Sequence, residues 1–239
     1  MVKKKLKEYL TRSVRKLKHR KGFGVHSPFA YGIITEVIEE KLPYYAYHRM
    51  QRTYDKQSPI PFKVACLLHR LANRFHCRNV AEVKCDRGFS ILPLLLLDTR
   101  LHVTTLADSA TQRIAEASTL GWLPRRIPQI SFIQQIEQFD ASAPYDMILI
   151  SGNPFEAVDG KPTPEQQAVA SAQLVDWIMT HSQDDTVIFV HGIQQGQPQE
   201  LFWDSLCDRD DVSITMDLFN YGLAILKPRF FKQHYIVSF

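Results

Sequence analysis

The ten residues AEVKCDRGFS, from Ala81 to Ser90, decide the fold of this chain, and the apolar run ILPLLLL follows them at 91–97. Their order predicts a buried strand, a tight turn and then a helix. In open α/β proteins this arrangement places the carboxyl end of the first strand where nucleotide-like ligands bind. We therefore expect a functional site within residues 82–90.

The rest of the chain alternates strands and helices, which predicts a parallel sheet with crossover helices. Strands are expected at 79–84, 102–107, 129–133, 145–151 and 185–191, and helices at about 89–98, 110–119, 164–181 and 197–207. Beyond Cys207 the pattern changes. The segments 212–219 and 222–226 predict a hairpin, and the tail 233–239 is a candidate edge strand.

The segment before the sheet predicts helices. Ser27 is a favourable N-cap and Pro28 a favourable first helical residue, so one helix is expected from there to about Lys41. A longer one is expected from about Pro61 to His76. The chain is thus divided into a basic arm at 1–21, N-terminal helices at 22–76 and an α/β domain at 77–239.

The net charge of +4 conceals an asymmetry between the arm and the body of the chain. The basic arm, residues 1–21, holds ten Lys or Arg and one Glu, net +9, whereas the remainder carries 19 basic and 24 acidic residues, net −5. Apolar residues at helical spacing predict that the arm is an amphipathic helix. Two interpretations stay open: it contacts an anionic membrane or nucleic acid, or it packs on the rest of the chain.

The cysteine pattern indicates the cellular compartment of the protein. Four cysteines without paired or metal-type spacing predict free thiols in a reducing cytoplasm. No apolar run approaches the roughly 20 residues that span a bilayer. No apolar segment follows the first basic residues, as it would in a secretory signal. We expect a cytoplasmic protein, and the sequence leaves its oligomeric state open.

The 82–90 turn resembles the E-x-G-x-x-x-G-[FY]-S loop of class I S-adenosylmethionine-dependent O-methyltransferases of the catechol-methylating type. Glu82, Gly88, Phe89 and Ser90 match this loop, and Lys84 stands at its first glycine. The segments G-x-H-S-P-F at 24–29 and M-D-L-F-x-x-G-L at 216–223 are similar to those of a bacterial branch of these proteins. The resemblance implies an α/β, Rossmann-like fold with a seven-stranded, mostly parallel sheet that ends in an antiparallel hairpin, after a helical extension.

The same resemblance implies how S-adenosylmethionine would be held. In the family, the loop after the first strand and an acid after the second strand contact this cofactor. The corresponding cofactor-binding candidates are Glu82, Lys84, Gly88, Phe89 and Ser90. Ala107 stands where the second-strand acid is expected, so Asp108, one residue later, is the candidate partner of the ribose.

The family's metal site is replaced. An aspartate after the fourth strand and an acidic pair after the fifth hold a divalent cation there, which lowers the pKa of the acceptor. This chain has Ser151 and then His191-Gly192 at those positions, so a hard cation such as Mg²⁺ lacks its oxygen ligands and no metal is expected. His191 remains the candidate catalytic residue, as a base or as a ligand of a softer metal.

Two classes of function follow from these positions. One is an enzyme that transfers a methyl group from S-adenosylmethionine to a small acceptor molecule without metal. The other is a methyltransferase-like protein that has impaired or lost metal-dependent O-methyl transfer and binds a partner through the basic arm. The replaced positions favour the second. At Lys84 an ammonium would also meet the cofactor's sulfonium, a repulsion of about 1–4 kcal/mol.

Overall fold

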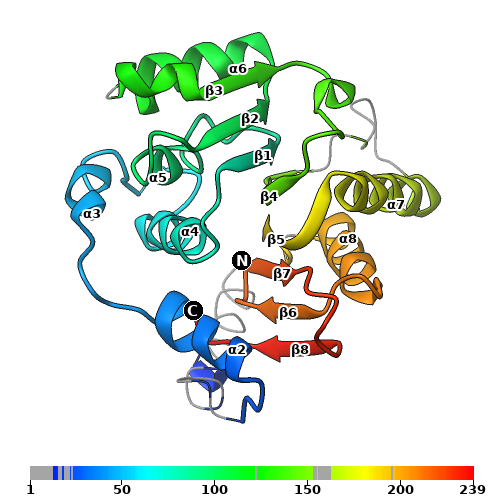
Figure 1. Ribbon diagram of the computed structural model, residues 1–239. Helices are drawn as coiled ribbons and strands as arrows, with labels where there is room; N and C mark the ends of the chain where they lie inside the picture. The colour runs from blue at the N-terminus through cyan, green and yellow to red at the C-terminus, as the bar shows by residue number, and fades with distance from the viewer. Residues whose placement is uncertain are drawn as a thin grey trace.

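The computed structural model describes residues 13–15, 18, 22, 24–56, 58–121, 123–152, 155, 163–194 and 196–239. An eight-stranded sheet runs through it in the order β3-β2-β1-β4-β5-β7-β6-β8, with helices packed against it (Figure 1). The strands are β1 (Asn79–Val83), β2 (His102–Leu106), β3 (Ile130–Ile133), β4 (Tyr145–Ile150), β5 (Ser182–His191), β6 (Ile214–Asp217), β7 (Tyr221–Ile225) and β8 (Gln233–Ile236).

The helices connect these strands and cover the sheet. The α-helices are α2 (Pro28–Gly32), α3 (Tyr45–Met50), α4 (Phe62–Arg74), α5 (Leu92–Leu95), α6 (Ser109–Ile114), α7 (Pro164–Thr180) and α8 (Gln197–Asp208). Two π-helical segments, η1 (Ile33–Ile38) and η2 (Ala115–Thr119), continue α2 and α6, and two 3₁₀ turns are η3 (Pro124–Gln129) and η4 (Ile136–Gln138).

Strand order decides where a site can form. β2 and β3 lie on one side of β1, whereas β4 and β5 lie on the other, and all five are parallel. The chain therefore leaves the ends of β1 and β4 in opposite lateral directions. Such a reversal opens a crevice at the carboxyl ends of the two strands, which is where ligands bind in open α/β sheets.

The end of the sheet has the predicted hairpin. β7 inserts between β5 and β6 and is antiparallel to both. The sheet has one strand more than the seven expected, because the tail forms β8, which pairs parallel with β6. The amide of Gln233 donates to the carbonyl of Ser213 at 2.7 Å, and that of Val237 donates to Asp217 at 2.9 Å.

Buried apolar side chains form one cluster on each face of the sheet. Val80 and Met147 belong to the cluster that includes Leu67 of α4. Ile148 belongs to the other cluster, with Leu174 of α7. Since the central strands are buried on both faces, their near-continuous apolar sequences are those of a parallel sheet.

Several helices differ from the expected ranges. The helix that starts at the confirmed Ser27 cap ends with η1 at Ile38, not near Lys41. There the Glu40 carboxylate accepts the amides of Lys41 and Leu42 and turns the chain. The helix expected at 89–98 is reduced to the four residues of α5, preceded by turns, and α3 was not predicted.

Little of the basic arm is described. Residues 13–15 and 18 are helical, and the rest of the predicted amphipathic helix lies outside the described residues. Within the described ranges, no helix combines the length and apolar character needed to cross a membrane.

Candidate functional site

The candidate site is the carboxyl edge of the sheet, where β1, β4 and β5 end. The turn 84–90 leaves β1 in an unusual backbone conformation, with φ of +62° at Lys84, +65° at Arg87 and +86° at Gly88. Glycine adopts this left-handed region freely, whereas a side chain there costs about 1–2 kcal/mol per residue. The position of the family's first glycine therefore keeps the glycine conformation although a lysine occupies it.

The Lys84 side chain lies across the end of β4. Its Cδ is 2.6 Å, and its Nζ 3.5 Å, from the point that a Cβ on Gly152 would occupy. A side chain at position 152 would require the flexible Lys84 stem to shift.

Two acidic residues stand at the turn, Glu82 in β1 and Asp86 in the turn itself. Glu82 is fully buried, and its Oε2 accepts a 2.5 Å hydrogen bond from the Thr105 hydroxyl of β2. Asp86 Oδ1 accepts the Ser90 amide at 2.9 Å. Among the described residues, Glu82 Oε1 and Asp86 Oδ2 are buried without a hydrogen-bond partner. This is a costly arrangement for two ionised carboxylates.

Burial therefore changes the protonation of this acidic pair. Desolvation, and then repulsion from Asp86, raises the pKa of Glu82 to about 8. Desolvation also raises the pKa of Asp86, against the hydrogen bonds from Ser90. Since the two carboxyls repel each other, the pair retains a proton at neutral pH.

Phe89 and Ser90, which also match the family loop, make hydrogen bonds to other residues of the protein. The Phe89 carbonyl accepts a hydrogen bond from the Tyr54 hydroxyl, and the two rings meet edge to face at 5.5 Å. Ser90 is buried, and its amide is used by Asp86. Tyr54 comes from the connection between α3 and α4, so this connection contacts the turn.

The ends of β4 and β5 present few ligand groups. Ser151 follows β4 and donates its amide to the Val83 carbonyl at 3.1 Å. His191 ends β5, and its ring stacks on Tyr221 of β7 at 5.1 Å. Desolvation lowers the pKa of His191, so its imidazole is neutral at neutral pH. Two small cavities adjoin this imidazole, each of about 10 Å³, which is the room that one water molecule needs.

The residues after β2, where the family has its ribose-binding acid, also make hydrogen bonds within the protein. Ala107 is buried, and its amide donates to the Ile133 carbonyl. Asp108 is exposed as the N-cap of α6, with Oδ1 accepting the amides of Ala110 at 2.9 Å and Thr111 at 2.7 Å. These bonds, that of Thr111 above all, lower the pKa of Asp108. In the structure its carboxylate caps a helix, and the prediction that it binds a ribose stays a prediction.

The described carboxyl edge departs from the family loop at Lys84 and at Asp108. The Lys84 stem lies against Gly152, and Asp108 caps its helix. Over the described parts of the chain, no three His, Cys, Asp or Glu side chains are grouped to hold a metal ion.

Comparisons with known proteins identify the fold. No family model matches the chain, and no curated protein matches it in sequence. Among solved structures, the O-methyltransferase from Bacillus cereus in complex with SAH is similar, with a TM-score of 0.55 and 16% identity over 81% of this chain and 96% of that one. The O-methyltransferase TomG from Streptomyces achromogenes, in complex with SAM, is also similar. Its TM-score is 0.55, and its sequence identity is 16% over 78% of this chain and 91% of TomG.

A third similar structure is the SAH-bound methyltransferase from Podospora anserina, with a TM-score of 0.55 and 10% identity over 83% of this chain and 95% of that one. The chain therefore has the Rossmann-like fold of the class I methyltransferases, as the sequence predicted. At these identities, the likeness shows the fold alone.

Sequence reasoning missed three residues of this edge. Tyr54 and Thr105 lie far from the loop in sequence, and nothing in their local patterns links them to Phe89 or Glu82. Gly152 carried a signal that went unused. Gly152 follows the buried strand β4, and Lys84 stands at a glycine position after β1. A glycine at 152 leaves space for a long side chain from position 84.

Proposed function

We propose that this protein is a methyltransferase-like member of the class I fold that does not carry out metal-dependent O-methyl transfer. The observation that carries the proposal is the contact between Lys84 and Gly152, since it places the lysine stem at the ends of β1 and β4, where the family loop has a glycine. Ser151 and His191 at the family's metal positions support it, because neither offers a carboxylate to a hard cation. The four free cysteines support a reducing, cytoplasmic location.

A second candidate is metal-independent methyl transfer from S-adenosylmethionine to a small acceptor. His191 favours it, because a neutral imidazole at the carboxyl edge can accept a proton from an acceptor hydroxyl. This reaction requires Lys84 to leave Gly152 when the cofactor binds. The two candidates therefore differ in whether the native chain binds the cofactor at all.

Calorimetric titration with S-adenosylmethionine and S-adenosylhomocysteine separates them. We expect no heat and no change in Tm for the native protein, with TomG as the positive control. Micromolar binding, worth about −8 kcal/mol, would overturn the proposal and favour the second candidate.

The Lys84→Gly variant tests the reason for the expected lack of binding. It removes the stem and the ammonium and restores the family residue, so we expect measurable cofactor binding. Arg87→Gly is the matched control, because it also removes a cation and a left-handed side chain from the turn but leaves Lys84 on Gly152. If Lys84→Gly bound no better than Arg87→Gly, Lys84 would not be the group that closes the site.

A further inference from the structure

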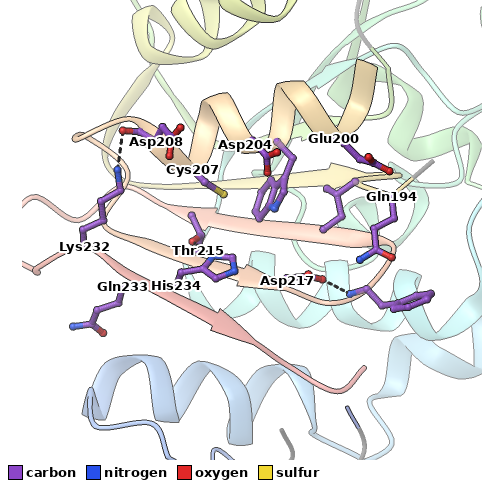
Figure 2. A pocket seen from close by; sticks show the side chains of 13 residues that line it. Gln194, Glu200, Asp204, Cys207, Asp208, Thr215, Asp217, Lys232, Gln233 and His234 are labelled. Carbon is purple, nitrogen blue, oxygen red and sulfur yellow. Dashed lines mark hydrogen bonds between the residues drawn. The ribbon is translucent and has the colours of Figure 1, made fainter. Parts of the chain in front are cut away.

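A cavity lies away from the carboxyl edge, between α8, β6 and β8. This groove has a volume of about 810 Å³ (Figure 2). One wall is α8, the floor includes Thr215 and Asp217 of β6, and His234 of β8 and Lys232 just before that strand form the far side. We call it the α8 groove.

The α8 groove is acidic. Glu200, Asp204 and Asp208 follow one another at intervals of four residues along α8, so they share one face of the helix, and all three are exposed. No cation of the described residues lies within ion-pair distance of these three carboxylates. Lys232, on the opposite side, donates its Nζ to the Asp208 carbonyl at 2.7 Å.

Arg15, a described residue of the basic arm, contacts Asp217 of this groove. Arg15 forms two parallel hydrogen bonds with Asp217, from Nη1 to Oδ1 at 2.7 Å and from Nη2 to Oδ2 at 2.9 Å. Its guanidinium also lies 5.3 Å from the centre of the Phe219 ring. The Arg15 and Asp217 side chains are 13% and 15% exposed, which makes this contact an anchor between residues 202 positions apart.

We propose that the α8 groove receives the chain's own basic segment, residues 1–12, which lies outside the described residues. This segment contains five cations, namely Lys3, Lys4, Lys5, Lys7 and Arg12. Their charge complements that of the α8 carboxylates, which have no cation within ion-pair distance in the described part of the chain, and Arg15 holds the segment's end at Asp217.

Length permits this placement. From Glu200 to Asp208 the helix rises about 12 Å. Twelve residues reach about 18 Å as a helix and up to about 40 Å when extended, so the segment can pass all three carboxylates in either conformation. An occupied groove would hold the arm's cations on this domain and keep them from other anions.

The test neutralises the groove in the full-length chain. Glu200→Gln, Asp204→Asn and Asp208→Asn are combined, and the control combines Glu137→Gln, Glu165→Gln and Asp176→Asn, which are exposed acids on other elements. Both triple variants raise the net charge by three. Immobilised heparin, a general polyanion, then reports whether the arm's cations are accessible.

We expect the groove variant to elute from heparin at a higher salt concentration than the control variant, because neutralisation releases the arm. Carbodiimide cross-linking of the native chain is the second measurement. Mass spectrometry should find the arm's lysines joined to Glu200, Asp204 or Asp208.

Equal elution of the two triple variants, with no such cross-link, would overturn the proposal. Cross-links found only between isotopically distinct copies would also overturn it, in favour of a second copy as the occupant. Binding of RNA or of phosphatidylserine vesicles by the native chain at the level of the groove variant would show that the arm is free for an external partner.

Discussion

Lys84 and Gly152 meet across the ends of β1 and β4, with the lysine Cδ 2.6 Å from the place of a glycine Cβ. The lysine adopts a φ of +62° to reach this position. The backbone conformation costs energy, and the side-chain contact is the feature of Lys84 that can offset part of this cost. This relationship underlies the proposed loss of activity.

The first prediction separates those two contributions. Lys84→Gly relieves the left-handed strain, whereas Lys84→Ala removes the same stem and keeps a Cβ at positive φ. We expect Lys84→Gly to be more stable than Lys84→Ala by about 1 kcal/mol in urea denaturation. Equal stabilities would mean that the turn relaxes and stores no strain at this residue.

The second prediction concerns the acidic pair at the turn. The raised pKa of Glu82, about 8 against an ordinary 4.5, means that the folded state holds a proton that the unfolded state has released. The contribution of Glu82 to the free energy of unfolding should therefore be largest at low pH, fall between about pH 4.5 and 8, and level off above that range. One such proton gives a slope of up to about 1.4 kcal/mol per pH unit.

Glu82→Gln should remove most of this slope, because an amide does not ionise. The measurement is urea denaturation from pH 5 to pH 9. The exposed Glu137→Gln serves as control and should keep the slope of the native protein. A Glu82→Gln variant that retained the native slope would contradict the assignment to this carboxyl.

The third prediction is the strength of the Arg15–Asp217 contact. A double-mutant cycle with Arg15→Ala and Asp217→Ala should give a coupling energy of about 1 kcal/mol, smaller in 0.5 M NaCl, since the pair is bidentate and mostly buried. Asp217→Ala alone should cost more than Arg15→Ala, because Asp217 Oδ1 also accepts the Phe219 amide at 2.7 Å. A coupling of zero would mean that the arm is not anchored there.

The fourth prediction concerns the packing of α8 on the sheet. A Cβ on Gly222 of β7 would lie 2.3 Å from Trp203 Cζ3, so the indole rests directly on the strand backbone. Gly222→Ala should lower the free energy of unfolding by about 1–3 kcal/mol through overpacking. Gly32→Ala is the control, because its nearest contact is 3.8 Å away and its helical position should favour alanine.

A fifth prediction concerns Asp146, at the amino end of β4 and away from the candidate site. Its Oδ2 accepts the amides of Arg78 and Asn79 at 2.7 and 2.9 Å, and its Oδ1 accepts from the Gln183 side chain at 2.8 Å. Asp146→Ala should destabilise the fold by about 1–3 kcal/mol. In the Lys84→Gly background it should leave cofactor affinity unchanged in calorimetry, and a loss of affinity without loss of stability would contradict this structural role.

Local sequence by itself determined the order of strands and helices. Apolar runs, the Ser27 cap and the glycine at 88 act within a few residues of themselves, so the alternation and the final hairpin could be predicted. The same local logic failed at helix ends. After Ile38 the Glu40 side chain accepts the amides of Lys41 and Leu42, a contact that a periodic pattern does not contain.

Only the tertiary structure decided what the replaced site residues do. The sequence placed Lys84 at a glycine position, but its contact with Gly152 depends on how β1 and β4 lie side by side. The buried pair of Glu82 and Asp86 likewise depends on packing, since burial raises both pKa values and pattern alone does not report burial. Spacing along the chain specifies which elements form, whereas the chemistry of a site depends on distances between elements, which exist only once the sheet has assembled.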